Sequence, residues 1–527
     1  MLVFRSTAIT SLVFATMLAL PAAAQEAKQC TIDEGKPSEV ARAYLTISQV
    51  AGTQGAAPAD EQKKLASAVH ILTENTGAVE NPIGHAYELG KLLVLWTVQP
   101  NVPLTAKRGT IGYATNPDSM VNLPAAIDSA FGAVETAMPE CEVETLKWRS
   151  QKAWINLVNG AIQELNAGSL DSADAHARLS LLFNKRAPYG WMVMAQVADR
   201  RQKTDSAIDL FQRTIAAAKD SAYEEVRTQS LLNLGNLAAA AGANASPNQQ
   251  KYLGVARTAF ETLVKDTTVK SAYRGQAGSG LVTVYLAMGD TAAARATYQP
   301  QLQNPSAYTF NELVQAGVWA SKADDAAAGL KLFHAAYEMN PYHRDALANL
   351  TIFELKAQHY DTALALVTRL HEVDPDGDNG RVATLTYAGL AKKYGDMNRD
   401  IVTRFAKTKD AKLKKVLTDS ATITADSNRF YTDLAVKANI ATDSMPVRVR
   451  FSEFSDVANK VTLAGVIENN TASDKTFTLK VDFLDKDGKV VASQQTTVGP
   501  VSGQSTGQFS MTVTAPGITA FKYAPLD

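Results

Sequence analysis

The middle of the chain places apolar or small side chains three and four residues apart, which is the spacing of one face of an α-helix. The pattern recurs every 34 residues, as it does between Pro341 and Pro375. Because each period holds two such stripes, it predicts two helices packed antiparallel. Six copies can be placed, and their first apolar positions are Leu157, Trp191, Leu231, Leu281, Leu313 and Leu347.

Each copy carries small and bulky residues at fixed positions. In the copy that starts at Leu313, Gly317 and Gly329 are small and Phe333 is bulky. Small residues let the two helices approach closely, and the bulky side chain fills the gap against the next pair. A single pair leaves apolar surface uncovered, so neighbouring pairs have to stack. We therefore predict a mainly α solenoid of antiparallel helix pairs over residues 146–380.

The period and these positions resemble the tetratricopeptide repeat (TPR) family, whose signature has Trp, Leu-Gly, Tyr, Ala, Phe, Ala and Pro at the same offsets. The resemblance covers residues 157–375, although Trp is present only in the copy at Trp191 and Leu-Gly is rare, as at Leu234 and Gly235. It implies a curved stack whose concave face, lined by the first helix of each pair, forms a groove for a polypeptide.

The repeat pattern is weaker on both sides of this region. Residues 25–145 are predicted to be divergent helical repeats, in which Leu89 and Gly90 match the Leu-Gly offsets. An insertion over 98–122, expected to be a long loop, displaces the second helix of that pair; the loop is either functional or the product of sequence drift. Residues 381–442 are expected to be helices that cap the last repeat with a polar outer face.

One dense basic run lies within these expected capping helices. It is either a solvated helix face or a contact for an anionic partner. The run consists of Lys407, Lys409, Lys412, Lys414 and Lys415.

From Pro446 the period of apolar residues changes from 3.6 to 2. Short alternating stretches separated by Asn, Asp, Gly and Pro predict a small all-β sandwich over 446–527. The sequence there resembles immunoglobulin-like modules of the FxLYD kind, a resemblance that says little about activity. In the favoured function the module would serve for docking or spacing. The matching positions are Gly465, Val466, Phe483 and Asp485, whereas Leu484 replaces the usual aromatic residue.

Residues 1–24 are typical of a secretory signal peptide. Arg5 precedes an apolar segment that ends at Leu20, and Ala22 and Ala24 stand before the predicted cleavage at Gln25. An uncleaved membrane anchor is the alternative, and the rest of the chain has no apolar run of spanning length. We expect a periplasmic or extracellular protein that does not span a membrane after cleavage.

The charge balance bears on which partners the protein can bind, and its two cysteines bear on the compartment in which it folds. The 527 residues hold 52 basic and 53 acidic side chains, so no net field attracts nucleic acid, and no nucleic-acid partner is expected. In an oxidising compartment Cys30 and Cys141 predict a disulfide, with two free buried thiols as the alternative. The disulfide would close a loop of more than 100 residues and tie the N-terminus to the helical body.

The stretch DPDGDN, which contains Asp374, Asp376 and Asp378, is a weak candidate for a calcium loop. An EF-hand loop needs a bidentate Glu at its twelfth position, where this chain has Leu385. Asp374 and Pro375 instead lie one period after Asn340 and Pro341, which favours a repeat boundary. No metal or cofactor is therefore expected.

Sequences that resemble catalytic motifs lack their supporting residues. The triplet His343-Arg344-Asp345 resembles a kinase catalytic loop, but no Gly-rich phosphate loop accompanies it. A periplasmic enzyme that uses the 98–122 loop as a lid is thus the least favoured function. A carbohydrate or surface-polymer binder would need exposed aromatic residues on the sandwich, whereas alternation turns Phe477, Phe483 and Phe509 inward.

The favoured function is a non-enzymatic scaffold or adaptor of a bacterial-type cell envelope that binds a protein or peptide partner. The Lys/Asn clamp with which some TPR proteins hold a terminal carboxylate is incomplete, because Leu232 stands where the lysine would accompany Asn236. The groove offsets of the TPR family, applied to these copies, indicate Gln196, Asp199, Arg200, Asn236, Gln276, Thr283, Asn311, Val318, Lys322 and Lys356.

Overall fold

The structure is a computed structural model that describes residues 29–52, 57–74, 79–243, 247–457 and 459–526. Contacts divide the chain into an N-terminal unit, Met1–Tyr223, and a C-terminal unit, Glu224–Asp527. The predicted signal peptide, residues 1–24, lies outside the described residues. None of the helices in the described ranges is both long and apolar enough to cross a membrane.

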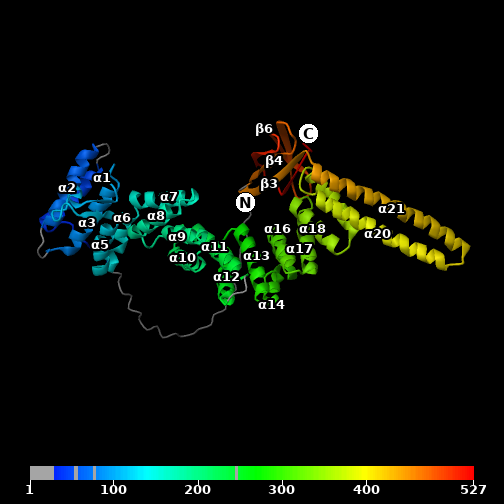
Figure 1. Cartoon of the computed structure of the whole chain (residues 1–527), viewed down its shortest axis with the longest axis horizontal. Helices are drawn as coiled ribbons and strands as arrows, with labels where there is room; N and C mark the ends of the chain where they lie inside the picture. The colour runs from blue at the N-terminus through cyan, green and yellow to red at the C-terminus, as the bar shows by residue number, and fades with distance from the viewer. Residues whose placement is uncertain (1–28, 53–56, 75–78, 244–246, 458, 527) are drawn as a thin grey trace, which may run out of the picture. The chain divides into compact units, whose positions relative to one another are not determined.

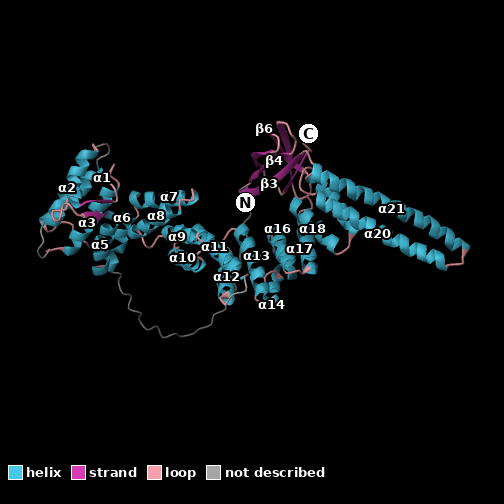
Figure 2. Ribbon diagram, viewed as in Figure 1, coloured by secondary structure: helices cyan, strands magenta, loops and turns pink. Residues whose placement is uncertain are grey.

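The N-terminal unit is helical, with one short β-hairpin (Figures 1 and 2). Its helices are α1 (Ser38–Gly52), α2 (Pro58–Glu74), α3 (Pro82–Thr97), α4 (Arg108–Ile111), α5 (Leu123–Ala137), α6 (Glu142–Arg149), α7 (Lys152–Asn166), α8 (Leu170–Phe183), α9 (Tyr189–Arg200) and α10 (Thr204–Ala217). The hairpin strands are β1 (Thr105–Lys107) and β2 (Met120–Asn122), and the 3-10 turns are η1 (Pro139–Cys141) and η2 (Ser221–Tyr223). The pairs α7–α8 and α9–α10 stack on a shared apolar core.

The insertion over 98–122, expected to be a long loop, is ordered and packed. β1 and β2 pair antiparallel, with Thr105 opposite Asn122, and α4 lies between them in sequence. Ile111 is fully buried, and the N–H of Ala114 donates to Thr73 Oγ1 on α2 at 3.0 Å. These contacts close the insertion onto α2, while α3 pairs with α5 across it.

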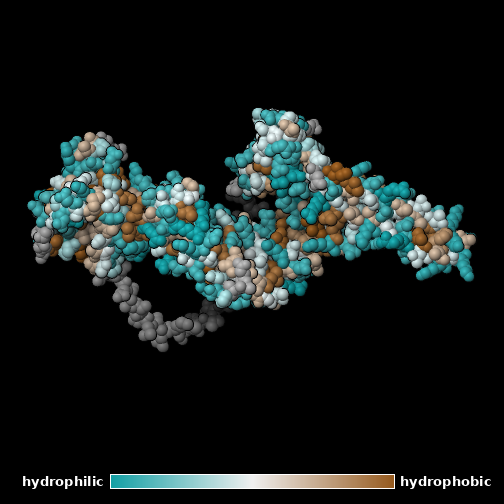
Figure 3. All heavy atoms as spheres, in the orientation of Figure 1, coloured by the Kyte–Doolittle hydropathy of each residue, from teal (hydrophilic) through white to brown (hydrophobic). Residues whose placement is uncertain are grey.

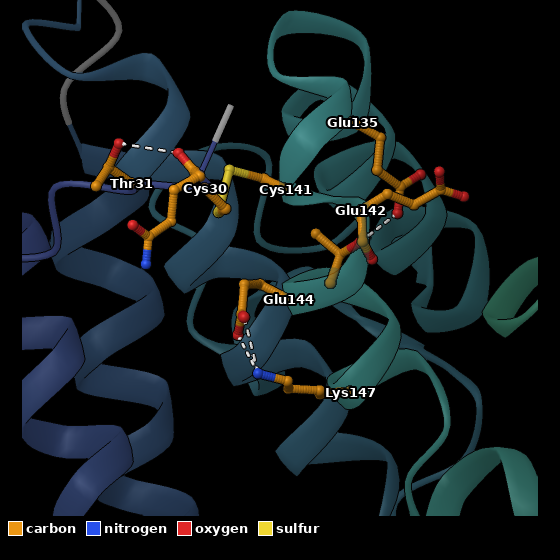
Figure 4. The surroundings of a disulfide bond; sticks show 9 residues. Cys30, Thr31, Glu135, Cys141, Glu142, Glu144 and Lys147 are labelled. Carbon is orange, nitrogen blue, oxygen red and sulfur yellow. Dashed lines mark hydrogen bonds and ion pairs between the residues drawn. A yellow bond between two sulfur atoms is a disulfide. The ribbon is translucent and has the colours of Figure 1, made fainter. Parts of the chain in front are cut away.

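A disulfide between Cys30 and Cys141 fixes the first described residues to the start of α6 (Figure 4). Nearby, the Lys91 ammonium lies 2.8 Å from both Glu34 and Glu88 and over the ring of Tyr87 at 4.7 Å. Glu88 is fully buried beside the Glu34 carboxyl group. Burial, followed by the hydrogen bond with Glu34, raises the pKa of Glu88 to about 8.

The C-terminal unit continues the helix pairs. They are α11 (Glu224–Gly242) with α12 (Gln249–Lys265), α13 (Ser271–Ala287) with α14 (Thr291–Ala296) and α15 (Gln299–Gln303), α16 (Phe310–Lys322) with α17 (Ala326–Met339), and α18 (Arg344–Lys356) with α19 (Tyr360–Val373); η3 (Pro305–Ala307) precedes α16. Together with the two pairs of the N-terminal unit, these confirm the predicted fold of antiparallel helix pairs.

Aromatic rings pack onto glycines at the predicted small positions. A Cβ on Gly317 would lie 2.7 Å from the ring of Phe333, within the same pair. The Phe333 ring in turn meets that of Phe353 in the next pair, with centroids 5.2 Å apart, and Phe353 covers Gly329. The bulky residue therefore fills space both inside its own pair and between neighbouring pairs.

After the last pair, α20 (Gly380–Lys407) and α21 (Ala411–Ser444) form a long antiparallel hairpin rather than helices of repeat length. The side-chain amides of Asn398 and Asn428 donate to backbone carbonyls of the opposite helix at 2.6 and 2.7 Å. The rings of Tyr394 and Tyr431 stack at 5.7 Å. The outer face is not uniformly polar, as a cap would be, because large apolar side chains stay exposed along both helices.

The C-terminal strands form two three-stranded antiparallel sheets, ordered β3-β4-β7 and β6-β5-β8. The strands are β3 (Val447–Val457), β4 (Lys460–Asn469), β5 (Lys475–Leu484), β6 (Val490–Val501), β7 (Ser505–Thr514) and β8 (Ala520–Tyr523). Phe477, Phe483 and Phe509 are buried in the common core, so none of the three is available to bind a sugar ring.

The DPDGDN stretch joins this β-sandwich to the end of the solenoid. Tyr523 donates its hydroxyl to Asp374 Oδ1 at 2.7 Å and accepts the N–H of Asp376 at 3.0 Å. Asp376 Oδ2 accepts the N–H of Leu526 at 2.8 Å. Asp374 and Asp376 are thus occupied by protein donors at a repeat boundary, whereas Asp378 is exposed. Within the described ranges, no group of three His, Cys, Asp or Glu residues is arranged to hold a metal.

We predict that Glu88 makes the N-terminal unit less stable as the pH rises. Because the folded pKa is raised to about 8 from an ordinary 4.5, the folded state keeps a proton that the unfolded chain releases. This contribution is fully present below pH 4.5 and is lost as the pH rises through about 8. Thermal unfolding from pH 5 to 9 should show a smaller fall in Tm for Glu88→Gln than for wild type. The same change at exposed Glu80 is the control, and equal slopes for both variants would contradict the prediction.

Tyr523→Phe should loosen the β-sandwich from the solenoid. It leaves Asp374 Oδ1 and the N–H of Asp376 without this partner in a buried place, which costs about 1 to 3 kcal/mol. Hydrogen exchange over residues 374–379 and 519–526 should accelerate at least about fivefold. Tyr394→Phe on the distant hairpin should leave these rates unchanged. Calcium that slows exchange there in wild type would instead support a metal loop.

Candidate functional site

A groove of about 530 Å³ opens between the first helices of three successive pairs in the C-terminal unit, α11, α13 and α16. This is the face on which the TPR resemblance places a ligand. Its lining residues are Asn236, Ala272, Gly275, Gln276, Ser279, Gly280, Val314, Gln315, Val318, Trp319 and Lys322.

The floor of the groove is formed by α13, whose sequence is rich in glycine and other small residues. A Cβ on Gly280 would lie 2.5 Å from the ring of Phe260, and a Cβ on Gly278 would lie 2.2 Å from the ring of Trp319. Helices on both sides can therefore approach α13 closely. Because Ala272, Gly275 and Ser279 carry little side chain, the exposed face of α13 stays hollow.

The α16 wall is fixed by two side chains that reach across to α13. Gln315 Nε2 donates to the backbone oxygen of Ser271 at 3.0 Å and to its hydroxyl at 2.9 Å. Trp319 Nε1 donates to the Gly275 oxygen at 3.0 Å. These bonds hold the wall in one position without a ligand, so the groove is largely preformed.

Four of the ten predicted groove residues line this groove: Asn236, Gln276, Val318 and Lys322. Thr283 lies on α13 two turns beyond Gln276, and its hydroxyl donates to the Ser279 oxygen at 3.0 Å. Lys356 is exposed on α18, with its ammonium 4.9 Å from the centre of the Phe353 ring. Neither Thr283 nor Lys356 lines the groove.

The remaining predicted residues lie elsewhere. Gln196, Asp199 and Arg200 are on α9 in the N-terminal unit, where the Arg200 guanidinium donates to the Leu165 oxygen. Asn311 lines a different hollow of about 230 Å³, next to the β-sandwich. The family offsets did not include Gln315 and Trp319, which also line the groove. The clustered glycines of α13 could have indicated Trp319, because a bare helix face of this kind is usually covered by an aromatic ring of a neighbouring helix.

The electrostatics of the groove are simple. Lys322 is exposed and is the only charged residue of the lining. The amides of Asn236 and Gln276 are both exposed, and an amide group can donate and accept hydrogen bonds. The lining contains no histidine, cysteine or carboxylate, so it offers no nucleophile paired with a base. The arrangement suits recognition of a chain with backbone polar groups and a negative charge.

The hollow beside the β-sandwich contains the His343-Arg344-Asp345 triplet, which acts there as packing. The His343 ring lies 4.4 Å from that of Phe310, and burial lowers the pKa of His343, so the ring is neutral at pH 7. Arg344 lies over Phe451 at 5.2 Å and pairs with Asp345 at 2.8 Å. The triplet therefore contacts Phe310 on α16 and Phe451 on β3, and it connects both elements to the start of α18.

No protein-family model and no curated protein sequence matches this chain. Solved structures to which it is similar include one described as a functional characterisation of Pseudomonas aeruginosa PilF, with 15% identity, a TM-score of 0.26, and coverage of 41% of this chain and 90% of that one. A tetratricopeptide repeat protein of Parabacteroides merdae has 11% identity, a TM-score of 0.30 and coverage of 52% and 100%. Yeast Tom70 has 10% identity, a TM-score of 0.28 and coverage of 80% and 68%.

We predict that Gly278→Ala disturbs the α16 wall. The new methyl group would overlap the Trp319 ring, and overpacking of this kind costs about 1 to 3 kcal/mol. Gly254→Ala on α12 is a matched control, because a Cβ there meets no atom within 4 Å and alanine favours helix by about 0.5 to 1 kcal/mol. Thermal unfolding should show a lower Tm for Gly278→Ala and an unchanged or higher Tm for Gly254→Ala. If Gly278→Ala leaves the Tm unchanged, the prediction is wrong, and the α16 wall can shift to accept the methyl group without loss of stability.

Proposed function

We propose that this protein is a non-enzymatic interaction scaffold that binds a polypeptide in the groove between α11, α13 and α16. The observation that carries the proposal is a preformed groove across three helix pairs, with amides on its surface and a glycine-rich floor. Such a surface holds a ligand through its backbone and its shape. It lacks the converging titratable groups that a catalytic pocket needs.

The charge of the groove indicates the kind of segment it binds. No carboxylate of the described residues forms an ion pair with Lys322, so its ammonium is available to a ligand. Val314 and Val318, both half-buried, offer apolar contact on the same wall. The favoured ligand is a peptide segment that carries an acidic residue next to an apolar one.

The cell envelope is the proposed location. The sequence of residues 1–24 supports export, and the Cys30–Cys141 disulfide supports an oxidising compartment such as the periplasm or the exterior of the cell. The mass of the protein isolated from a secreting host tests this part, since cleavage before Gln25 removes 24 residues.

Binding of selected peptides to the full chain tests the groove. Peptides enriched from a random display library should bind wild type, and Lys322→Glu should weaken the acidic ones at least about tenfold, equal to about 1.4 kcal/mol. Ser279→Trp, which fills the floor, should weaken all of them. Fluorescence anisotropy with labelled peptides gives the affinities.

Lys331→Glu is the matched control, because Lys331 is an exposed lysine on the second helix of the α16–α17 pair and makes the same change in net charge. It should leave the affinities unchanged. If Ser279→Trp binds every selected peptide as wild type does, the groove is not the binding site.

A further inference from the structure

The free end of the α20–α21 hairpin concentrates positive charge. Between residues 404 and 416 the chain has six basic side chains, Arg404 and the five lysines of the basic run, and one acidic side chain, Asp410. The Asp410 carboxylate accepts the N–H groups of Lys412 and Leu413 at 2.8 and 3.2 Å, so it caps α21. We call residues 402–416 the hairpin tip.

Ion pairing does not account for these lysines, and helix stability accounts only for Lys407, which lies in the last turn of α20, where the helix dipole favours positive charge. Within the described residues, no carboxylate forms an ion pair with any of the five, while Arg404 has Asp400 at 3.8 Å. Lys412, Lys414 and Lys415 occupy the start of α21, where the helix dipole favours negative charge. Lys414 lies over the Phe405 ring at 5.3 Å, but the position of the three lysines and their mutual repulsion oppose folding. An external anionic partner is therefore the simplest reason for the cluster.

Large apolar side chains are interleaved with the lysines. Val402, Phe405, Leu413 and Val416 are 52%, 38%, 39% and 59% exposed. Figure 3 shows hydrophobic residues beside hydrophilic ones near this end of the hairpin. A hollow of about 410 Å³ opens between the helices next to Val402 and Phe405, and no charged residue lines it. Basic and apolar groups are therefore offered to the same partner.

The position of the tip favours a surface over a bound peptide. α20 packs against α18 and α19 only through its first part, and towards the tip the two helices contact each other. The lysines thus stand at a projecting end, without surrounding walls that would orient a particular sequence. Flexible ammonium groups above apolar side chains match a bilayer, whose anionic headgroups lie above its acyl chains.

We infer that the hairpin tip docks the protein on a membrane surface that carries anionic lipid headgroups, with the lysines at the headgroups and the apolar side chains among the upper acyl chains. This surface lies on elements other than those of the peptide groove. The docking is peripheral, because the tip is too short to span a bilayer. It depends on the local charge of the tip, since the whole chain is nearly neutral.

Vesicle co-sedimentation of the full chain tests this inference. Wild type should bind phosphatidylcholine vesicles that contain 30% phosphatidylglycerol and should not bind pure phosphatidylcholine vesicles. Binding should weaken at least tenfold in the triple variant Lys412→Gln, Lys414→Gln, Lys415→Gln. Binding should also weaken in the double variant Leu413→Ser, Val416→Ser. For wild type, binding should decrease as the salt concentration rises from 0.05 to 0.5 M.

A charge-matched control separates the tip from net charge. Lys480→Gln, Lys486→Gln, Lys489→Gln removes three exposed lysines of the β-sandwich and should bind anionic vesicles as wild type does. Circular dichroism should show equal helix content in all variants. An unfolded triple tip variant is not expected, because its lysines oppose the helix dipole.

Four results would overturn the inference. They are no binding of wild type to anionic vesicles, equal binding to neutral vesicles, an equal loss of binding in the β-sandwich control, and complete competition by millimolar glycerol phosphate. Soluble polyglutamate that binds as tightly as the vesicles, independently of Leu413 and Val416, would assign the tip to an acidic polypeptide instead.

Discussion

Close packing of aromatic rings on glycine is the interaction on which the helix pairs depend. Phe260 lies against both Gly235 and Gly280, which belong to consecutive pairs, and therefore ties them together. Phe333 on Gly317 and Phe353 on Gly329 repeat the arrangement further along the chain. A ring on a bare helix face brings the backbones close and buries a large apolar area, so each pair obtains from its neighbour the core that it cannot form alone.

The same constraint creates the groove. Because α13 must accept Phe260 on one side and Trp319 on another, it carries glycines at 278 and 280, and this part of the helix is thin. A thin helix between two thicker ones leaves a hollow on its exposed face. The hydrogen bond from Trp319 to the Gly275 oxygen then anchors the wall of that hollow. The binding surface is thus a by-product of how the pairs stack, and sequence changes that fill the glycine positions would alter both.

The sequence predicts the helix pairs because the apolar positions of each helix lie three and four residues apart, and this spacing recurs with the same residue types in every copy. The features that sequence missed depend on distant partners. Asp374 and Asp376 looked like ligands or boundary residues, and nothing nearby shows that Tyr523 and Leu526 bind them. The strands in the insertion at 98–122 are three residues long each, too short to show an alternating pattern, and the insertion is held against α2 in part through Thr73. Family offsets pointed to Asn236, Gln276, Val318 and Lys322, but they could not separate these from Asn311, which lines a different hollow next to the β-sandwich.

Large apolar side chains are exposed along the α20–α21 hairpin, whereas in the helix pairs most of them are buried. In the pairs, Phe333 and Leu347 are fully buried, and among the described residues of α7 to α19 the exposed large apolar side chains are few: Ile155, Met339 and Ile352. Along α21, Val416, Ile423 and Phe430 recur every seven residues and are 59%, 65% and 57% exposed, although the hairpin seam is closed by Asn428 and Tyr431. Side chains with this spacing lie on one face of a helix. The packing of α20 on α21 therefore does not account for this face, whose end at Val416 belongs to the hairpin tip.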